Sequence, residues 1–299
     1  MDRNLFAGLL AALAAAVIGS AWQLVSRHGV TTTLGPMELA LMRYGIPALL
    51  LAPLWFGKKR RIAPKASRVA LVLLVVGGGL PFGLLVLAGA QWAPASHMGI
   101  FMAGSLPLFT AIGAWVHKGQ KVEGIRLAGL VCIAIGMALF AAGSFRGGSL
   151  DWRGDLLFLT AAMLWAVHSL AFAHCRLTPW QGAAFVNGWS ALLLLPVLLL
   201  STVGAPRLLS APWPDVALQA ATQGVVAGLL GLVVYMVAVV RLGAPRASLS
   251  AALVPVLTTL GAAACMNEPV TGAVLLALAL VVPGIVLASG VVRWGAKEA

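Results

Sequence analysis

The chain contains ten long apolar stretches, each about as long as a membrane is thick, and they constrain its fold more than any other feature. A helix needs about 20 apolar residues to cross the hydrocarbon core of a bilayer. The stretches cover residues 6–26, 36–56, 69–90, 94–116, 125–143, 156–173, 182–203, 216–240, 247–266 and 271–292. Their apolar residues are continuous rather than alternating, which favours helices over a transmembrane β-barrel. We therefore predict an all-α membrane protein with ten transmembrane helices and short loops.

The composition excludes a soluble globular enzyme. Of the 299 residues, 61% are hydrophobic and only 9% are Asp, Glu, Lys or Arg. Soluble domains are about 25% charged. So few charges cannot cover the surface of a water-soluble protein of this length.

The basic residues are divided unevenly between the loops. If the N-terminus is cytoplasmic, the inner segments hold 15 of the 20 Lys and Arg residues and the outer loops hold 4, with Arg43 inside a span. Cytoplasmic loops normally carry this excess. We therefore predict that both termini are cytoplasmic. The same orientation explains the net charge of +12, so we expect no nucleic-acid partner.

The three cysteines lie in the apolar stretches or at their ends. Cys132, Cys175 and Cys265 have neither metal-ligand nor disulfide-framework spacing. We expect them to act as small core residues, and we predict no metal site and no cofactor.

An internal repeat divides the chain into two halves. The segment PLFTAIG, from Pro107 to Gly113, matches PVLTTLG, from Pro255 to Gly261, at an offset of 148 residues. Spans two and seven also agree, at an offset of 143 residues. We predict two five-helix repeats, residues 1–146 and 147–299. Because five is odd, the second repeat must be inverted in the membrane, which is a common transporter design.

With these features the whole chain resembles a known family. The features are Pro36 followed by Arg43 in span two, the stretch from Tyr235 to Pro255, and the Asn-Glu-Pro sequence around Glu268. The chain resembles the EamA-type branch of the drug/metabolite transporter superfamily, and within it the exporters of aromatic amino acids. The resemblance implies a central cavity lined by spans one to four and six to nine, with spans five and ten at the periphery. One departure from the pattern is Gln120, which stands in the first half where Glu268 stands in the second.

Two pairs of residues are candidates for substrate binding because they place aromatic or imidazole rings within spans. Trp165 and His168 are three residues apart, so they share one helix face near the middle of span six. The second pair of candidates is Trp22 in span one and His97 near the outer end of span four. Flat rings can stack on an aromatic ligand. The alternative for each Trp is bundle packing or an interfacial position, and for each His a hydrogen bond to a neighbouring helix.

Three further residues are candidates for different reasons. Arg43 is the one charged side chain well inside a predicted span, and such a charge is expensive in a membrane. It could bind a substrate carboxylate, or it could extend outward towards Glu38. The family resemblance adds Tyr235 and Ser248.

Glycine and proline residues mark two candidate hinges. They lie in span three and span eight: Gly77, Gly78, Gly79, Pro81, Gly228 and Gly231. These residues could allow the helices to bend during alternating access. Tight helix packing or a static kink is the alternative.

We predict a secondary transporter and not an enzyme, because the sequence lacks clustered catalytic or metal-binding residues. A mostly apolar cavity with scattered polar groups suits an amphipathic metabolite. The expected function is export of amino acids, aromatic ones above all, by alternating access across the bacterial cytoplasmic (inner) membrane. The alternative is a broad-specificity drug or metabolite exporter. The expected partners are the small-molecule substrate and the lipid bilayer, with the chain as a monomer or homodimer.

The driving force is predicted from the placement of the carboxylates. All eight Asp and Glu residues lie at or near the predicted membrane edges, which favours a facilitator driven by the substrate gradient. Proton exchange through His168 or His97 is the alternative. The chain has no Walker A sequence, so ATP is not expected to drive transport directly.

Overall fold

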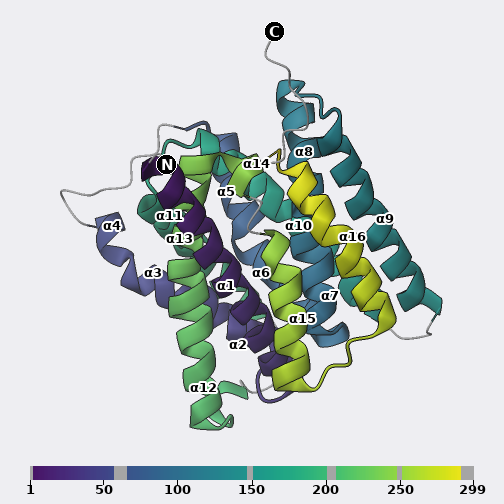
Figure 1. The fold of residues 1–299 in the computed structure, drawn as a ribbon. Coiled ribbons are helices and arrows are strands. Elements are labelled where there is room, and N and C mark those ends of the chain that lie inside the picture. The colour runs from purple at the N-terminus through teal and green to yellow at the C-terminus, as the bar shows by residue number, and fades with distance from the viewer. Residues whose placement is uncertain (1–2, 57–65, 147–150, 201–206, 248–250, 291–299) are drawn as a thin grey trace.

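The computed structural model describes residues 3–56, 66–146, 151–200, 207–247 and 251–290, and this part of the chain is a bundle of helices with short connections (Figure 1). The elements of the first half are α1 (Arg3–Thr31), α2 (Pro36–Ala40), η1 (Leu41–Gly45), α3 (Ile46–Leu50), α4 (Ala52–Phe56), α5 (Arg68–Gly78), α6 (Leu80–Trp92), α7 (Ala95–Met98), η2 (Gly99–Ala103), α8 (Gly104–Lys118) and α9 (Ile125–Arg146). Those of the second half are α10 (Asp151–His174), α11 (Pro179–Leu200), η3 (Arg207–Leu209), α12 (Trp213–Gln219), η4 (Ala220–Gly231), α13 (Leu232–Leu242), α14 (Ala244–Ala247), α15 (Leu253–Met266) and α16 (Gly272–Ala288). The all-α prediction is confirmed for the described residues.

Seven helical segments in the described residues are long and apolar enough to cross a membrane. They are Arg3–Thr31, Arg68–Trp92, Ala95–His117, Ile125–Gly143, Asp151–His174, Pro179–Leu199 and Trp213–Leu242. Two more apolar helices, α15 and α16, are shorter, at 14 and 17 residues. The number of ten crossings and the cytoplasmic location of the termini therefore stay predictions.

The predicted span 36–56 is a helical run of four short pieces rather than one helix. It begins as α2, passes through the π-helical segment η1 and continues as α3 and α4. The run bends at Leu51, whose backbone is not helical, two residues before Pro53. Proline lacks a backbone N–H and collides with the preceding turn, so it ends or kinks a helix.

The two halves exchange their first helices. Helix α1 packs against η4, α13 and α15 of the second half, and α10 packs against α5, α6 and α8 of the first half (Figure 1). We call these two groups the α1 bundle (α1, η4, α13 and α15) and the α10 bundle (α10 with α5, α6, α7, η2 and α8). Each bundle thus combines one helix of one half with the third and fourth helical segments of the other.

Helices α9 and α16 pack against each other along one side of the molecule (Figure 1). The backbones approach closely where glycines meet: a Cβ on Gly129 would lie 2.5 Å from the Ala288 nitrogen and 2.6 Å from the Gly284 oxygen. Small residues allow such contacts between membrane helices. The opposite face of α9 exposes large apolar side chains at every fourth position, including Leu127, Val131 and Ile135. A face of this kind suits contact with lipid.

We expect that Gly129→Ala destabilises the α9–α16 contact. The new methyl group would meet backbone atoms, which cannot move aside as a flexible side chain could. Overpacking of this kind costs about 1–3 kcal/mol, so the purified protein in detergent should aggregate at a temperature lower by several degrees. The matched control is Gly143→Ala on the same helix, where a Cβ meets nothing within 4 Å. Equal stability of the two variants would contradict the packing argument.

Span three is interrupted at Gly79, between α5 and α6. Gly79 has a non-helical backbone (φ −97°, ψ −146°), so backbone groups near it lose their helical partners. The Leu80 nitrogen donates to the Ser190 hydroxyl at 3.0 Å instead of to a helical carbonyl, and Tyr44 donates at 2.6 Å to the Gly79 oxygen, which also accepts from the Gly83 nitrogen at 3.0 Å. Backbone groups inside a membrane need such internal partners. The break is therefore held by residues from η1 and α11.

Candidate functional site

A central cavity of about 110 Å³ lies between the α1 bundle and the α10 bundle. Its lining residues come from α1, η1, α6 and η2 of the first half and from α10, η4, α13 and α15 of the second, together with Ala251 before α15. Most are apolar; Gln23, Arg43 and Tyr235 supply the polar atoms. The elements match the spans that the family resemblance implied, except that α11, in the predicted span seven, contributes no lining residue.

Aromatic rings form a continuous wall of the cavity. The ring centroids of Trp22 and Phe82 are 6.0 Å apart, those of Phe82 and Trp165 are 4.7 Å apart, and those of Trp165 and Tyr235 are 5.1 Å apart. The four rings come from α1, α6, α10 and α13, so both bundles contribute. An aromatic or apolar ligand could stack on these surfaces.

Arg43 places a buried cation at this wall. Its side chain is 5% exposed, and its guanidinium carbon lies 4.1 Å from the centroid of the Trp22 ring. Its Nε and Nη1 atoms are buried without a hydrogen-bond partner. The Glu38 carboxylate has other partners and accepts hydrogen bonds from the backbone nitrogens of Gly35 and Arg207. The Arg43 guanidinium therefore lies over Trp22 in this structure rather than beside Glu38.

Three π-helical segments surround the cavity. Arg43 lies in η1, Met102 and Ala103 in η2, and Ala227 and Gly231 in η4. Each π turn inserts an extra residue into a helix, and such turns are frequent at functional sites. They change which side chains of these spans face the cavity, which an unbroken α-helical periodicity does not predict.

Beside Trp22, a network of buried amides and hydroxyls joins α1 to η4 and α15. The Trp22 indole donates to Gln223 at 2.8 Å, and the Gln223 amide donates to the Ser26 hydroxyl at 2.8 Å. Thr258 donates to Gln23 at 3.0 Å. Each of these polar side chains has 3% or less of its surface exposed. The network fixes the orientation of Trp22 within the α1 bundle.

His168 lies behind the aromatic wall rather than in the cavity lining. Its ring stacks on Trp165 at 5.0 Å with an angle of 28° between the planes. It donates from Nδ1 to the Leu74 oxygen at 3.0 Å and packs against Gly77 and Gly78. His168 thereby supports Trp165 from behind, and its Nε2 atom is buried without a hydrogen-bond partner.

His97 lies apart from the cavity. Its Nδ1 atom is 2.8 Å from an oxygen of Asp155, and both side chains are buried. The His97 ring also packs on Phe140 at 4.6 Å. Asp155 lies in the first turns of α10, near the predicted membrane edge, yet only 4% of its surface is exposed. The sequence did not indicate that this carboxylate is buried against a histidine.

The remaining predicted site residues have separate environments. Tyr235 lines the cavity and shares a 2.7 Å hydrogen bond with Ser169. Ser248 lies outside the described residues. Gly231 lines the cavity next to Ile18, and Gly228 lies against the backbone of Arg43.

The predicted hinge glycines lie at close helix contacts. A Cβ on Gly77 would meet the Leu164 oxygen at 2.5 Å and the His168 nitrogen at 2.6 Å. Close packing is therefore one role of Gly77 and Gly78. Bending at Gly79 and Pro81 stays a prediction. Such bending would have to break or rearrange the hydrogen bonds that Tyr44 and Ser190 form at the interruption.

A cavity between two exchanged helical bundles, walled by residues from both, is an arrangement that suits a membrane transporter. The sequence pattern of the EamA-like transporter family matches residues 6–142 and again residues 152–290. The chain therefore belongs to the EamA-like transporter family and carries two EamA repeats in one multi-pass membrane protein. Members of this family are transporters of small molecules and not enzymes.

The fold also has a solved counterpart. A crystal structure with 20% sequence identity superposes with a TM-score of 0.64, and the match covers 94% of this chain and 95% of the other. At this identity the likeness supports the fold alone. Comparison with curated protein sequences gives no significant match.

Proposed function

We propose that this protein is a secondary transporter that exports aromatic amino acids across the bacterial cytoplasmic membrane by alternating access. The observation that supports this substrate class is Arg43, a buried guanidinium with two unpaired nitrogens beside four aromatic rings. An unpaired buried cation is costly, and a substrate carboxylate would supply the missing hydrogen bonds. The rings of Trp22, Phe82, Trp165 and Tyr235 would hold an apolar or aromatic side chain.

The alternative is a broad drug or metabolite exporter. Within this alternative, cationic drugs are the less favoured substrates. Arg43 places a positive charge in the cavity lining, and no Asp or Glu side chain lines the cavity in the described residues. A cationic ligand would meet like charge in a low-dielectric site. Neutral and anionic amphipathic molecules stay compatible with the alternative.

The proposed energy source for transport is the concentration gradient of the substrate. The buried pair of His97 and Asp155 lies away from the cavity lining. His168 also lies behind the lining and touches it through Trp165. Neither group lines the cavity where a carboxylate would be bound.

Counterflow in proteoliposomes tests the proposed function. Vesicles loaded with unlabelled tryptophan should accumulate labelled tryptophan or phenylalanine through the purified protein, and tryptophanamide, which lacks the carboxylate, should compete at least about tenfold more weakly, as expected for one lost charge-assisted contact. Imposed pH gradients of either direction should leave the exchange rate unchanged. Absence of exchange for every aromatic amino acid would contradict the substrate proposal, and a rate that follows the pH gradient would contradict the facilitator proposal.

A further inference from the structure

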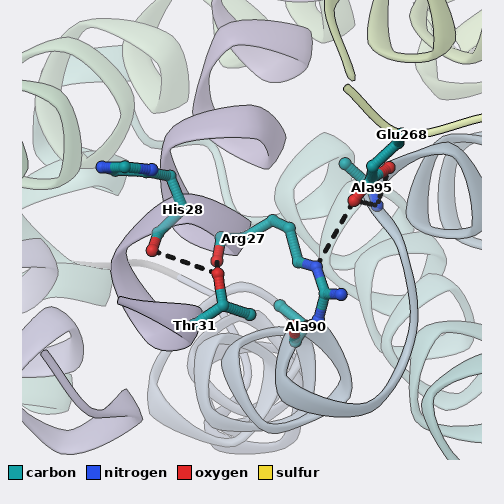
Figure 2. Close-up of polar contacts among 6 residues, drawn as sticks. All are labelled: Arg27, His28, Thr31, Ala90, Ala95 and Glu268. Carbon is teal, nitrogen blue, oxygen red and sulfur yellow. Dashed lines mark hydrogen bonds and ion pairs between the residues drawn. The ribbon is translucent and has the colours of Figure 1, made fainter. Parts of the chain in front are cut away.

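An ion pair between Arg27 and Glu268 lies at one end of the molecule, the end predicted to face outward (Figure 2). The Nε atom of Arg27 lies 3.4 Å from an oxygen of Glu268, and the two side chains are 20% and 14% exposed. Arg27 belongs to the α1 bundle, and Glu268 lies in the loop that directly follows its last helix. Arg27 lies in the last turns of α1. Glu268 follows α15, and its backbone nitrogen donates a hydrogen bond to the Ala262 oxygen in that helix.

Each member of this pair also bonds the α10 bundle. Arg27 donates from Nη1 to the Ala90 oxygen at 2.6 Å, in the last turn of α6. Both carboxylate oxygens of Glu268 accept from the Ala95 nitrogen, at 3.0 and 3.2 Å, where the helical segment Ala95–His117 begins. Figure 2 shows the Arg27 head group between Ala90 and Glu268, with the Glu268 carboxylate at Ala95.

The charges suit the two helix ends that they bond. A helix carries partial negative charge at its C-terminus and partial positive charge at its N-terminus. The cation of Arg27 meets the end of α6, and the anion of Glu268 meets the start of the next helical segment. Hydrogen bonds with an ionised partner are stronger than neutral ones. The pair therefore bonds the α10 bundle on both sides of the turn between α6 and α7, at Ala90 before it and at Ala95 after it.

We propose that Arg27 and Glu268 form a clasp that keeps the central cavity closed at this end and must release before the cavity opens there. The cavity lies between the two bundles, and opening one end requires them to separate at that end. The contacts of Arg27 with Ala90 and of Glu268 with Ala95 cross between the bundles. This inference rests on the alternating access proposed above, but it concerns a different part of the molecule from the substrate contacts.

The opposite end lacks an equivalent clasp in the described residues. Gln120 occupies the position that corresponds to Glu268 in the repeat, so no carboxylate stands at that position, and the carboxylate of this loop, Glu123, is exposed. The other ion pair in the described residues, His97 with Asp155, joins two elements of the same bundle. The clasp thus favours the state that is closed at the predicted outer end.

Cysteine labelling tests the clasp without any substrate. Gly19 lines the cavity, and a Cβ there meets nothing within 4 Å, so Gly19→Cys places a thiol in the cavity without a clash. Cys132 and Cys265 are changed to Ala, and the buried Cys175 is kept. A membrane-impermeant thiol reagent is then added outside intact cells, and labelling of position 19 is followed by mass spectrometry.

We expect slow labelling in the parent and at least about tenfold faster labelling with Glu268→Gln or Arg27→Gln, since each change removes a charge-assisted contact between the bundles. The matched control is Glu123→Gln, an exposed carboxylate in the corresponding loop of the first half, which should leave the rate unchanged. The double variant Arg27→Glu with Glu268→Arg restores an ion pair but puts each charge at the wrong helix end, so it should stay fast.

Three outcomes would overturn the clasp. Labelling rates unchanged by both single variants would show that the pair does not hold this end closed. Slow labelling in the charge-reversed variant would show that the helix ends play no part. Rapid labelling of Cys175 in the detergent-purified variants would show general unfolding instead of opening at one end. Because none of these readouts involves transport, the clasp can fail while the proposed function stands, and the reverse also holds.

Discussion

Arg43→Gln is expected to abolish the preference for carboxylates and to lower counterflow of tryptophan by about 100-fold or more. Removing one partner of a buried, hydrogen-bonded charge pair costs about 2–5 kcal/mol, and each 1.4 kcal/mol is about tenfold in affinity. Glutamine keeps a polar head but cannot offer the paired, charged N–H groups of arginine. Proteoliposome counterflow of tryptophan and tryptophanamide, measured side by side, gives the change in preference.

The stability of the same variant distinguishes substrate binding from a structural role. Two nitrogens of Arg43 are buried without a hydrogen-bond partner, so removing the charge relieves a desolvation cost. We expect the thermal stability of Arg43→Gln in detergent to equal or exceed that of the parent, and tryptophan to add less stability to it. Arg207→Gln is the matched control because that residue is exposed, in a loop predicted to lie outside the membrane. Normal transport by Arg43→Gln, or lost transport together with a much lower stability, would contradict the carboxylate role.

Trp165→Ala is expected to remove transport of aromatic amino acids and to destabilise the protein. The Trp165 ring contacts Phe82, His168 and Tyr235 at centroid distances of 4.7 to 5.1 Å, so its loss leaves a hole in the middle of the aromatic wall. Truncating a core tryptophan to alanine costs about 3–5 kcal/mol. The measurements are counterflow and the temperature of aggregation in detergent.

Trp165→Phe separates the binding role from the stability role. Phenylalanine keeps a ring against Phe82 and Tyr235, so we expect a folded protein whose apparent affinity for tryptophan is weaker by about tenfold, the cost of about 1.4 kcal/mol. The matched control is Trp115→Phe on α8, a tryptophan that is 56% exposed on the outer surface of the bundle. Equal affinities for the parent and both Phe variants would show that the Trp165 ring does not contact the substrate.

The sequence could predict the helices and part of the cavity wall because those signals are local. Continuous apolar stretches define membrane helices without reference to the rest of the chain, and the charge of Arg43 inside such a stretch marks it at once. Trp22, Trp165 and Tyr235, singled out from the sequence, do line the cavity.

Other parts of the site depend on partners far away in the chain. Trp22 and Gln223 are 201 residues apart, and His97 and Asp155 are 58 residues apart. In helices that are apolar on all sides, the sequence does not show which face meets which neighbour. Phe82 looked like an ordinary apolar residue for this reason, and Arg27 was counted only as one of the four basic residues of the predicted outer loops.

The exchange of first helices has a consequence for how the protein is made. Helix α1 leaves the ribosome first, yet the buried amide and hydroxyl groups of Gln23 and Ser26 bond Thr258 and Gln223, which are synthesised more than 190 residues later. Until then these polar groups need water, the insertion machinery or temporary neighbours, because lipid offers no hydrogen bonds. Biogenesis of this fold therefore includes a waiting period for α1, which ends only when η4 and α15 have entered the membrane.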